Sequence, residues 1–372
     1  MKKIDYKKHP IQLDFIESLS MNNKQKSLSI NLKTEQNFKI IDIFSGCGGL
    51  SYGFEQTKKF KTVCAIDIWN VALETIKINK PHVDVINSSM ELISDSDIKN
   101  IKQKFGNIEV VVGGPPCQGF SMAGKRNATD PRNELWRHYV RFVSIIKPNW
   151  FIFENVSGLI SMKNSSGEKI IDMIIGEFSR IGYTCQINQI SAKDFDVPQD
   201  RRRLIIIGSK SGKMIKLKPV NNKNYKTVRN AIADLEILES GEISKNDQYH
   251  FAMNHNENHI KWLKPVPEGR SAHDFKKITG MNVRGYATTY KRIWWDRPSP
   301  AITTCFNSIS SQNNVHPTNT RALTIREAMR IQTFPDDFKF SGTLKDIRTQ
   351  IGNAVPPELA KQIALQILNN IN

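Results

Sequence analysis

Long apolar runs are missing from this sequence of 372 residues. No stretch approaches the roughly 18 consecutive apolar residues that a membrane-spanning helix needs, so we expect no membrane partner. The opening residues, Met-Lys-Lys-Ile-Asp, lead into further charged residues and not into the apolar core of a secretory signal. The sequence therefore predicts a cytoplasmic protein.

Cysteine is scarce, and its spacing excludes the common zinc sites. The chain has five cysteines, an odd number, and they are scattered. No Cys-x-x-Cys pair or His/Cys cluster is present, so no metal site is predicted. Scattered cysteines are typical of a reducing compartment, where a single thiol can be free to react. The candidates are Cys47, Cys64, Cys117, Cys185 and Cys305.

Acidic residues are outnumbered by basic ones. The chain has 53 Lys and Arg against 36 Asp and Glu, which gives a net charge of +17 and a pI near 9.6. This excess favours an acidic polymer such as nucleic acid as a partner, because each neutralised phosphate releases counterions. A basic proteome rich in Lys and Asn would give the same charge, so composition alone leaves both interpretations open.

Short apolar segments alternate with helical ones from residue 38 onward. The segments with the pattern of strands are Phe38–Phe44, Thr62–Ile66, Ile108–Gly114, Trp150–Phe153 and Arg203–Gly208. This alternation predicts an α/β fold with a doubly wound, mostly parallel sheet. Ligands of such sheets bind at the carboxyl ends of the strands, which is where the unusual residues of this chain occur.

Composition divides the chain into four parts. Residues 1–36 are rich in Lys, Asn, Gln and Ser and predict a loosely ordered basic extension. The strand and helix pattern marks a main domain at 37–221 plus 347–372. Between 222 and 318, Trp, His, Asn, Arg and Pro are mixed irregularly, which indicates a second, smaller domain. Residues 319–346 are interpreted as a hinge or connecting segment.

A glycine loop follows the first predicted strand, in the sequence Asp42-Ile-Phe-Ser-Gly-Cys-Gly-Gly49. Glycines at such a position let the backbone approach a nucleotide-like ligand, although the dinucleotide pattern Gly-x-Gly-x-x-Gly is absent. The next predicted strand is followed by Asp67, whose carboxylate is placed to accept hydrogen bonds from a ribose diol. The plainer alternative is a tight turn with a solvated acid.

The stiffest loop of the sequence is Gly113-Gly-Pro-Pro-Cys-Gln-Gly-Phe-Ser121. Two glycines and two prolines leave the chain few conformations, so Cys117 is predicted on a rigid loop at a strand end. A free thiol has a pKa near ~8.5, and backbone amides or cations are needed to make it a thiolate at neutral pH. A buried structural cysteine is the alternative, and it fits poorly with such polar flanks.

Two further polar motifs occur beside predicted strands. Glu154, in Phe-Glu-Asn-Val, is a candidate proton donor, because an apolar wall would raise the pKa of its carboxyl group. Gln199-Asp-Arg-Arg-Arg203 concentrates cations, of which Arg201 and Arg203 suit a phosphate or a polar substrate edge. Each has a plainer alternative, a satisfied polar residue for Glu154 and a solvated basic turn for the arginines.

Taken together and in this order, the motifs resemble the cytosine-5 DNA methyltransferase family of prokaryotic restriction-modification systems, from residue 38 to the C-terminus. The resemblance continues through Arg321-Ala-Leu-Thr-Ile-Arg-Glu-Ala-Met-Arg-Ile-Gln-Thr-Phe-Pro335 and Gln350-Ile-Gly-Asn-Ala-Val-Pro356. It implies a Rossmann-like sheet of the S-adenosylmethionine-dependent methyltransferase type. It also implies methyl transfer to carbon 5 of a flipped-out cytosine.

The resemblance assigns the catalytic roles. Cys117, with Gln118 beside it, would add to C6 of the base and so make carbon 5 nucleophilic. Glu154 would protonate or hydrogen-bond N3, and Arg203 would hold the base. Arg201 would assist around the nucleophile and phosphate.

The resemblance also implies S-adenosylmethionine as the cofactor. The corresponding residues are Phe44, Ser45, Gly46, Cys47, Gly48, Gly49, Asp67, Ile68, Pro116, Leu135, Asn353 and Val355. Two departures weaken the match. Asp67 stands where the family usually has Glu, and Asn87-Ser-Ser-Met90 stands where an Asp commonly meets the adenine amino group.

The irregular region at 222–318 would then be the target-recognition domain for double-stranded DNA. It contains Trp294-Trp-Asp-Arg-Pro-Ser-Pro-Ala-Ile-Thr-Thr304, similar to the family's element before its recognition loop. Side chains there can read base edges in the major groove. The expected DNA-binding residues are Ser121, Arg284, Arg292, Arg297, Thr303 and Thr304.

Several wider expectations accompany this interpretation. The protein would be a monomer of the prokaryotic cytosol or nucleoid, with a cognate restriction endonuclease as a functional partner. Three rival hypotheses stand beside it. A tRNA cytosine-5 methyltransferase shares the chemistry, and an inactive DNA-binding regulator would not need the intact Cys117, Glu154 and Arg203. An NAD-dependent dehydrogenase using Cys117 would need the absent dinucleotide pattern.

Overall fold

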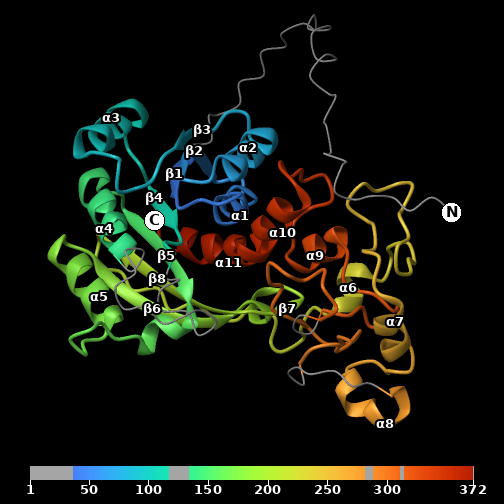
Figure 1. Cartoon of the computed structure of the whole chain (residues 1–372). Helices are drawn as coiled ribbons and strands as arrows, with labels where there is room; N and C mark the ends of the chain where they lie inside the picture. Colours follow the sequence, from blue (N-terminus) through green and yellow to red (C-terminus); the bar gives the residue numbers. More distant parts are fainter. Residues whose placement is uncertain (1–36, 117–133, 281–287, 311–313, 372) are drawn as a thin grey trace, which may run out of the picture.

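A seven-stranded sheet forms the core of one half of the molecule in the computed structural model, which describes residues 37–116, 134–280, 288–310 and 314–371 (Figure 1). The strand order is β3-β2-β1-β4-β5-β8-β6. The strands are β1 Phe38–Ile43, β2 Phe60–Asp67, β3 Asp84–Asn87, β4 Val110–Gly113, β5 Trp150–Val156, β6 Thr184–Ser191 and β8 Arg202–Ser209. The first five are parallel, whereas β8 runs antiparallel to both β5 and β6. The predicted fold class is confirmed.

Helices cover both faces of this sheet, because its central strands are apolar on both sides. On one face, α1 and α11 pack on Ile40 and Val112, with α2 beside them on Ala65. On the other face, α3, α4 and α5 pack on Ile41 and Val111. Their bounds are α1 Gly49–Glu55, α2 Asn70–Asn79, α3 Asp95–Phe105, α4 Leu135–Ile146, α5 Ile170–Arg180 and α11 Pro357–Leu368.

Two strands of the sheet escaped the sequence analysis. The edge strand β3 is half-buried and only four residues long. The strand β6 mixes Thr, Gln and Asn with apolar residues, because it borders only β8 and lies at the other edge. Edge strands lack the continuous apolar run by which buried parallel strands are recognised.

The remaining part of the molecule has little regular structure and a core of its own. Its elements are α6 Val228–Ile232, α7 Glu257–Leu263, α8 Lys276–Thr279, α9 Ile325–Ile331, α10 Leu344–Asn353 and β9 Ser299–Pro300. The strand β9 pairs with β7 Gln199–Asp200, which belongs to the part of the chain that forms the sheet. Short 3-10 turns occur at η3 Ser157–Ser161, η4 Ala192–Phe195 and η5 Ala272–Phe275. We call residues 222–354 the second half and residues 37–221 with 355–371 the sheet half.

Residues 319–346 are packed inside the second half. Leu323, Ile325 and Met329 share one hydrophobic core with Val228 and Ile293. The helix α9 in this stretch begins with a capping box, in which Thr324 and Glu327 each bond the other's backbone amide. The four-part division, with residues 319–346 as a hinge or connecting segment, stays a prediction.

The sheet has one topological switch point, between β1 and β4. The chain proceeds from β1 outward to β2 and β3, and then returns to the other side of β1 with β4 and β5. Open sheets bind ligands in the crevice outside the carboxyl ends of the strands at such a point. The segments that follow β1 and β4 are the glycine loop after Ile43 and the Pro115–Pro116 segment after Gly113.

Candidate active site

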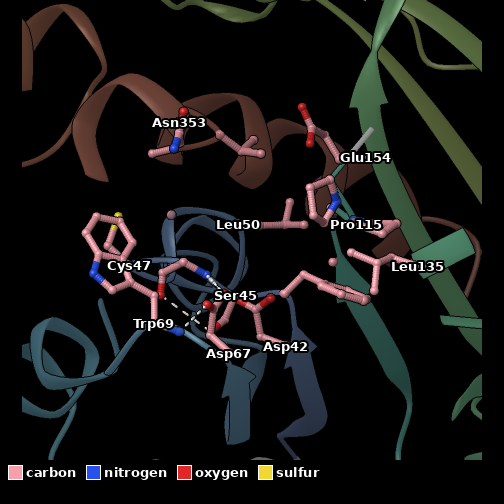
Figure 2. A pocket seen from close by; sticks show the side chains of 18 of the residues that line it. Asp42, Ser45, Cys47, Leu50, Asp67, Trp69, Pro115, Leu135, Glu154 and Asn353 are labelled. Carbon is pink, nitrogen blue, oxygen red and sulfur yellow. Dashed lines mark hydrogen bonds between the residues drawn. The ribbon is translucent and has the colours of Figure 1, made fainter. Parts of the chain in front are cut away.

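A cavity of about 660 Å³ lies at this switch point, within the range of about 300–1,000 Å³ that is usual for small-molecule sites. Its walls come from the segments that follow β1, β2, β3 and β4, from the end of β5, from Arg201 and Arg203 around the start of β8, and from the end of α10. Figure 2 shows Asp67 and Trp69 on one side of the cavity, and Pro115 and Glu154 across from them. The cavity therefore has two chemically different ends.

The glycine loop forms the first wall. Gly46 has a φ of +51° and open space where a side chain would be, so its backbone is exposed to the cavity. A Cβ on Gly49 would lie 2.5 Å from the carbonyl oxygen of Val355, so only glycine lets this loop meet the segment after α10. The two glycines thus keep the backbone close to whatever the cavity holds.

Asp67 fixes this loop. Its carboxylate accepts hydrogen bonds from the backbone N–H groups of Gly46, at 2.8 Å, and Trp69, at 2.9 Å. Burial raises the pKa of Asp67, and the bonds from Gly46 and Trp69 oppose that shift. A carboxylate has about four lone-pair directions, so these two bonds leave it able to accept more. The predicted contact with a ribose diol stays a prediction.

Asp42 is a buried acid in the floor of the cavity that the sequence analysis did not select. Its side chain is 1% exposed, and its Oδ2 has no hydrogen-bond partner among the described residues. Burial raises the pKa of Asp42 to about 7, opposed by a hydrogen bond from Ser51 and the charge of Lys80. In the sequence it is one acid in the mostly apolar strand Phe38–Ile43, which does not tell which way its side chain faces.

Most predicted cofactor residues meet at this cavity. Gly48 is the exception, because a Cβ there would face Ile76 in the protein interior. The predicted residues that line it are Phe44, Ser45, Gly46, Cys47, Gly49, Asp67, Ile68, Pro116, Leu135, Asn353 and Val355. The sequence analysis missed Asp42, Leu50, Trp69, Ser88, Ser89, Glu91, Pro115, Asn155, Gln350 and Ala354, among others. Ser88, Ser89 and Met90 also line the cavity, and they belong to the segment that lacks the Asp expected to meet the adenine amino group.

At the other end, Glu154 and Arg203 form an ion pair, with 2.7 Å between Oε1 of Glu154 and Nε of Arg203. Both side chains are largely buried, which strengthens a charge-assisted hydrogen bond. A Cβ on Gly114 would lie 2.7 Å from Oε2 of Glu154, so glycine lets the carboxylate reach the loop after β4. The structure thus brings together two of the predicted catalytic side chains.

Asn155, next to Glu154, anchors the start of the predicted nucleophile loop. Its side-chain amide donates to the carbonyl of Pro115 at 3.0 Å, and the residue is buried. Pro116, which also lines the cavity, is the last described residue before Cys117. The predicted residues Cys117, Gln118 and Ser121 lie outside the described residues. Their roles stay predictions.

Among the described cysteines, burial disfavours the thiolate at three positions. It raises the pKa of Cys47, Cys64 and Cys185 to about 12 in each case. Cys47 lines the cavity, but as a neutral thiol directed at the carbonyl of Gln350. These three residues are therefore poor nucleophiles.

Arg201 lines the cavity but is held by acceptors inside the protein. It is 3% exposed, and its two terminal nitrogens donate to the carbonyls of Ile302 and Gly352, each at 2.8 Å. Burial lowers the pKa of Arg201 well below its ordinary value, with a further contribution from the charge of Arg203. Both terminal nitrogens thus have acceptors inside the protein, and the predicted phosphate contact stays a prediction.

The predicted DNA-binding arginines differ sharply from one another. Arg292 is 2% exposed and donates to the carbonyls of Leu263, Val266, His316, Thr318 and Asn319. It therefore holds the second half together and is not available to DNA, which corrects the prediction. Arg297 is exposed, with its guanidinium 4.6 Å from the centre of the Trp294 ring. Arg284 lies outside the described residues.

Thr303 and Thr304 are half-buried against the end of α10. A Cβ on Gly352 would lie 2.5 Å from the backbone nitrogen of Thr304. The predicted recognition element thus lies directly beside Asn353, a residue of the cavity wall. Whether these threonines contact DNA stays a prediction.

The comparison with known families identifies the chain. A family model for C-5 cytosine-specific DNA methylases matches residues 38–369. The chain belongs to this family. The predicted enzyme class, DNA cytosine-5 methyltransferase, is thereby confirmed, and so is the resemblance from which it came.

Relatives of this methylase cover nearly its whole length. It is 34% identical over 382 residues to Type II methyltransferase M.DdeI of Desulfomicrobium norvegicum, covering 90% of each chain. It is 36% identical to Type II methyltransferase M1.HphI of Haemophilus parahaemolyticus, covering 88% of this chain and 86% of that one. A crystal structure named as a DNA modification methyltransferase of an E. coli prophage matches with a TM-score of 0.70 and 25% identity, over 90% of this chain and 99% of that one. A mutant of Spodoptera frugiperda DNMT2 shares the fold alone, with a TM-score of 0.61 and 14% identity, over 89% of this chain and 100% of that one.

The described residues of the methylase contain neither a metal-ligand cluster nor a membrane-spanning helix. Within the part of the chain that the structure describes, no three His, Cys, Asp or Glu side chains are grouped so that they could hold a metal ion. In the same described ranges, every helix is too short or too polar to span a bilayer.

Proposed function

We propose that this protein transfers a methyl group from S-adenosylmethionine to carbon 5 of a flipped-out cytosine in a short, specific duplex DNA sequence, through a covalent bond between Cys117 and C6. The observation that carries the proposal is the Glu154–Arg203 ion pair beside the Pro115–Pro116 segment, across one cavity from the Asp67 and glycine-loop wall. One end of the cavity is suited to bind a base and the other end to bind a nucleotide-like cofactor, so the cavity suits transfer of a methyl group from the cofactor to the base.

The lining residues fit the cofactor. The open backbone at Gly46 and the polar wall of Asp67, Ser88 and Ser89 suit an adenosine, and Trp69 offers an aromatic face. The unpartnered carboxylate oxygen of Asp42 needs a donor, which an ammonium group supplies. When bound, S-adenosylmethionine supplies an electrophilic methyl group.

The residues at the other end would act on the base. The thiolate of Cys117 forms a bond to C6, and the electron pair of the C5–C6 double bond makes carbon 5 the nucleophile. Glu154 holds a proton or hydrogen bond at N3, where charge develops, and Arg203 orients Glu154 and the base. After methyl transfer, a base removes the C5 proton and the bond between sulfur and C6 breaks.

The substrate and setting follow from the relatives. Both named relatives are Type II methyltransferases, which supports a restriction-modification role in which methylation protects host DNA from a cognate endonuclease. That endonuclease is a functional partner and need not bind. We propose a monomer that works on duplex DNA in the cytosol or nucleoid. DNA is favoured over tRNA by the family match, and the Glu154–Arg203 pair favours an active enzyme over an inactive regulator.

Expression in cells that lack cytosine methylation tests the proposal. Deamination sequencing of the plasmid should find 5-methylcytosine at one position of one short recurring sequence. Expression of a Cys117→Ala variant is the matched control and should leave the plasmid unmodified. If cells that express the wild-type protein contained unmodified plasmid and methylated tRNA, the tRNA alternative would replace this proposal.

A further inference from the structure

Four segments far apart in the sequence meet in a buried polar junction between the two halves. They are Gln199–Arg201 from the sheet half, and Ile302, Gln332 and Ile351–Gly352 from the second half. Gln199 and Gln332 are both 0% exposed. Amide groups buried this completely cost free energy unless every donor and acceptor is satisfied, so the junction permits few alternative arrangements.

The peptide groups on both sides of Ile302 are held by one short segment. The carboxamide oxygen of Gln199 accepts from the backbone N–H of Ile302 at 2.9 Å, and Nη1 of Arg201 donates to its carbonyl at 2.8 Å. The adjacent pairing of β7 with β9 aligns Gln199 with Ser299. The backbone just before Thr303 is therefore fixed relative to the sheet.

The same segment reaches the wall of the cofactor cavity. Nη2 of Arg201 donates to the carbonyl of Gly352 at 2.8 Å, so one guanidinium bonds the carbonyls that precede Thr303 and Asn353. In parallel, the amide of Gln199 donates to Gln332 at 2.7 Å, and the amide of Gln332 donates to the carbonyl of Ile351. Two chains of hydrogen bonds thus lead from Ile302 to the residues before Asn353.

We propose that Gln199 is a positioning residue which, with Arg201 and Gln332, couples occupancy of the DNA site to occupancy of the cofactor site. The inference rests on the proposed function, because it takes Thr303–Thr304 as part of the DNA site and Asn353–Val355 as part of the cofactor site. A shift of the backbone at one site must break junction bonds or move the other site with it. Each ligand therefore favours the backbone arrangement that the other binds.

The test compares wild type with Gln199→Met, which keeps the side-chain length and removes both hydrogen bonds. Binding of the non-reactive analogue S-adenosylhomocysteine is measured by calorimetry, with and without the duplex that plasmid mapping identifies. The ratio of the two dissociation constants is the coupling factor, which is typically about 5-fold to 150-fold where two sites communicate. Gln186→Met, on β6 at the far edge of the sheet, is the matched control.

We expect wild type and Gln186→Met to share a coupling factor of about 5 or more, and Gln199→Met to fall to about 1–2. Affinity of Gln199→Met for the analogue alone should stay within roughly threefold. A purely structural residue would weaken both affinities and leave their ratio unchanged, and that result would overturn the proposal. A wild-type ratio of 1 would overturn it as well, even if wild-type plasmid is methylated as the proposed function requires.

Gln332→Met provides a second test of the coupling. It removes the bonds of Gln332 to Gln199 and to Ile351 and leaves the two bonds to Ile302 in place. The coupling factor should fall here too, by less than in Gln199→Met, and the double variant should be no worse than Gln199→Met alone. Loss of a cooperative melting transition in both single variants would mean that the junction serves the fold, which would contradict the proposal.

Discussion

In the sheet half, apolar side chains on both faces of the strands form the core, and the unusual polar residues stand at strand ends around one cavity. In the second half, irregular segments are joined by buried charged and polar side chains. Arg292 bonds five carbonyls there, and Arg321 and Glu327 form a buried ion pair at 2.7 Å. A regular sheet satisfies its own backbone, whereas irregular loops need side chains to do so.

This difference suggests a division of labour. The sheet half provides a rigid site for chemistry, and the second half provides loops whose shape depends on a few polar side chains. Such loops can change in sequence while the sheet remains the same, which suits a protein that must read one DNA sequence. Changes in the two halves should therefore have different consequences.

The largest effect should come from Cys117→Ala, the change that removes the nucleophile from the sheet half. We expect methyl transfer to fall by roughly 1,000-fold or more, with duplex binding retained. A duplex with 5-fluorocytosine at the target should trap wild type covalently, because fluorine replaces the proton that must leave. Gel electrophoresis under denaturing conditions reports the trapped complex. Efficient turnover by the Ala variant would remove Cys117 from the mechanism.

The next effect concerns the second half and uses two arginines five residues apart. Arg292→Met should lower the free energy of unfolding by about 3 kcal/mol or more, because several buried carbonyls lose their donor. Arg297→Met should change it by less than about 0.5 kcal/mol, since that side chain is exposed. Chemical denaturation measures both. Equal stability of the two variants would contradict the structural role of Arg292.

The exposed Arg297 also allows a test of how the second half contacts DNA. If it contacts a base edge, Arg297→Met should cost about 1–3 kcal/mol on the cognate duplex only. If it contacts phosphate, all duplexes should weaken alike and the salt dependence should flatten. Titrations with cognate and scrambled duplexes at two salt concentrations separate these outcomes, and no change in either would remove Arg297 from the DNA-binding surface.

The effect of Glu154→Gln should be confined to the rate. It retains the shape and a hydrogen bond to Arg203 but cannot exchange a proton, so we expect a loss of roughly 100-fold or more in kcat. Affinity for the cofactor should be little changed. Glu109→Gln, at the opposite end of β4 beside Asn149, is the control and should match wild type. Equal losses of rate and cofactor affinity would assign Glu154 to binding.

The two halves should also respond oppositely to acid. Burial lowers the pKa of His316 to about 4, and its ring nitrogen accepts a hydrogen bond from the backbone of Asn319 at 2.9 Å, which protonation would break. An unfolded histidine has a pKa near 6.5, so the unfolded state binds more protons between about pH 6.5 and pH 4. Acidification from pH 7 to 5.5 should therefore cost the second half on the order of 1 kcal/mol from this residue.

Protonation of Asp42 has the opposite effect on the stability of the sheet half. Its pKa of about 7 in the fold lies above that of an unfolded Asp, so the folded state holds the extra proton and gains stability as pH falls from about 7 to 4. Hydrogen exchange at pH 7 and 5.5, corrected for intrinsic rates, should show protection falling around α9 and not in β1. His316→Asn should reduce the loss around α9. Equal loss in both halves would contradict this assignment.

The sequence predicted the sheet half well, and the reason is physical. Buried parallel strands are continuous apolar runs, and glycines and prolines at their ends mark places where the backbone must take unusual shapes. The sequence therefore predicted half of the residues in the cavity wall, including Asp67 and Asn353. It missed Asp42, because one acid in an apolar strand gives no sign that its side chain faces a cavity.

The second half was predicted less well, because its buried side chains do not recur at a regular spacing along the sequence. Arg292 and Arg297 stand in similar aromatic and polar surroundings in the sequence, yet one is buried and the other exposed. The acceptors of Arg292 come from two other segments, around residues 263–266 and 316–319, and no local pattern announces them. The internal hydrogen bonds of Arg201 were missed for the same reason, since its acceptors are about 100 and 150 residues away.

The division of labour is tested most directly by exchanging residues 222–318 for the matching block of a relative with a different target. Deamination sequencing of plasmid from cells expressing the chimera locates each 5-methylcytosine. The reciprocal chimera is the control for packing of the new block against α9, which shares a core with α6. If the second half reads the DNA and the sheet half performs the chemistry, each chimera should methylate the site that belongs to its block. Methylation that stays on the original sequence in both chimeras would contradict the account.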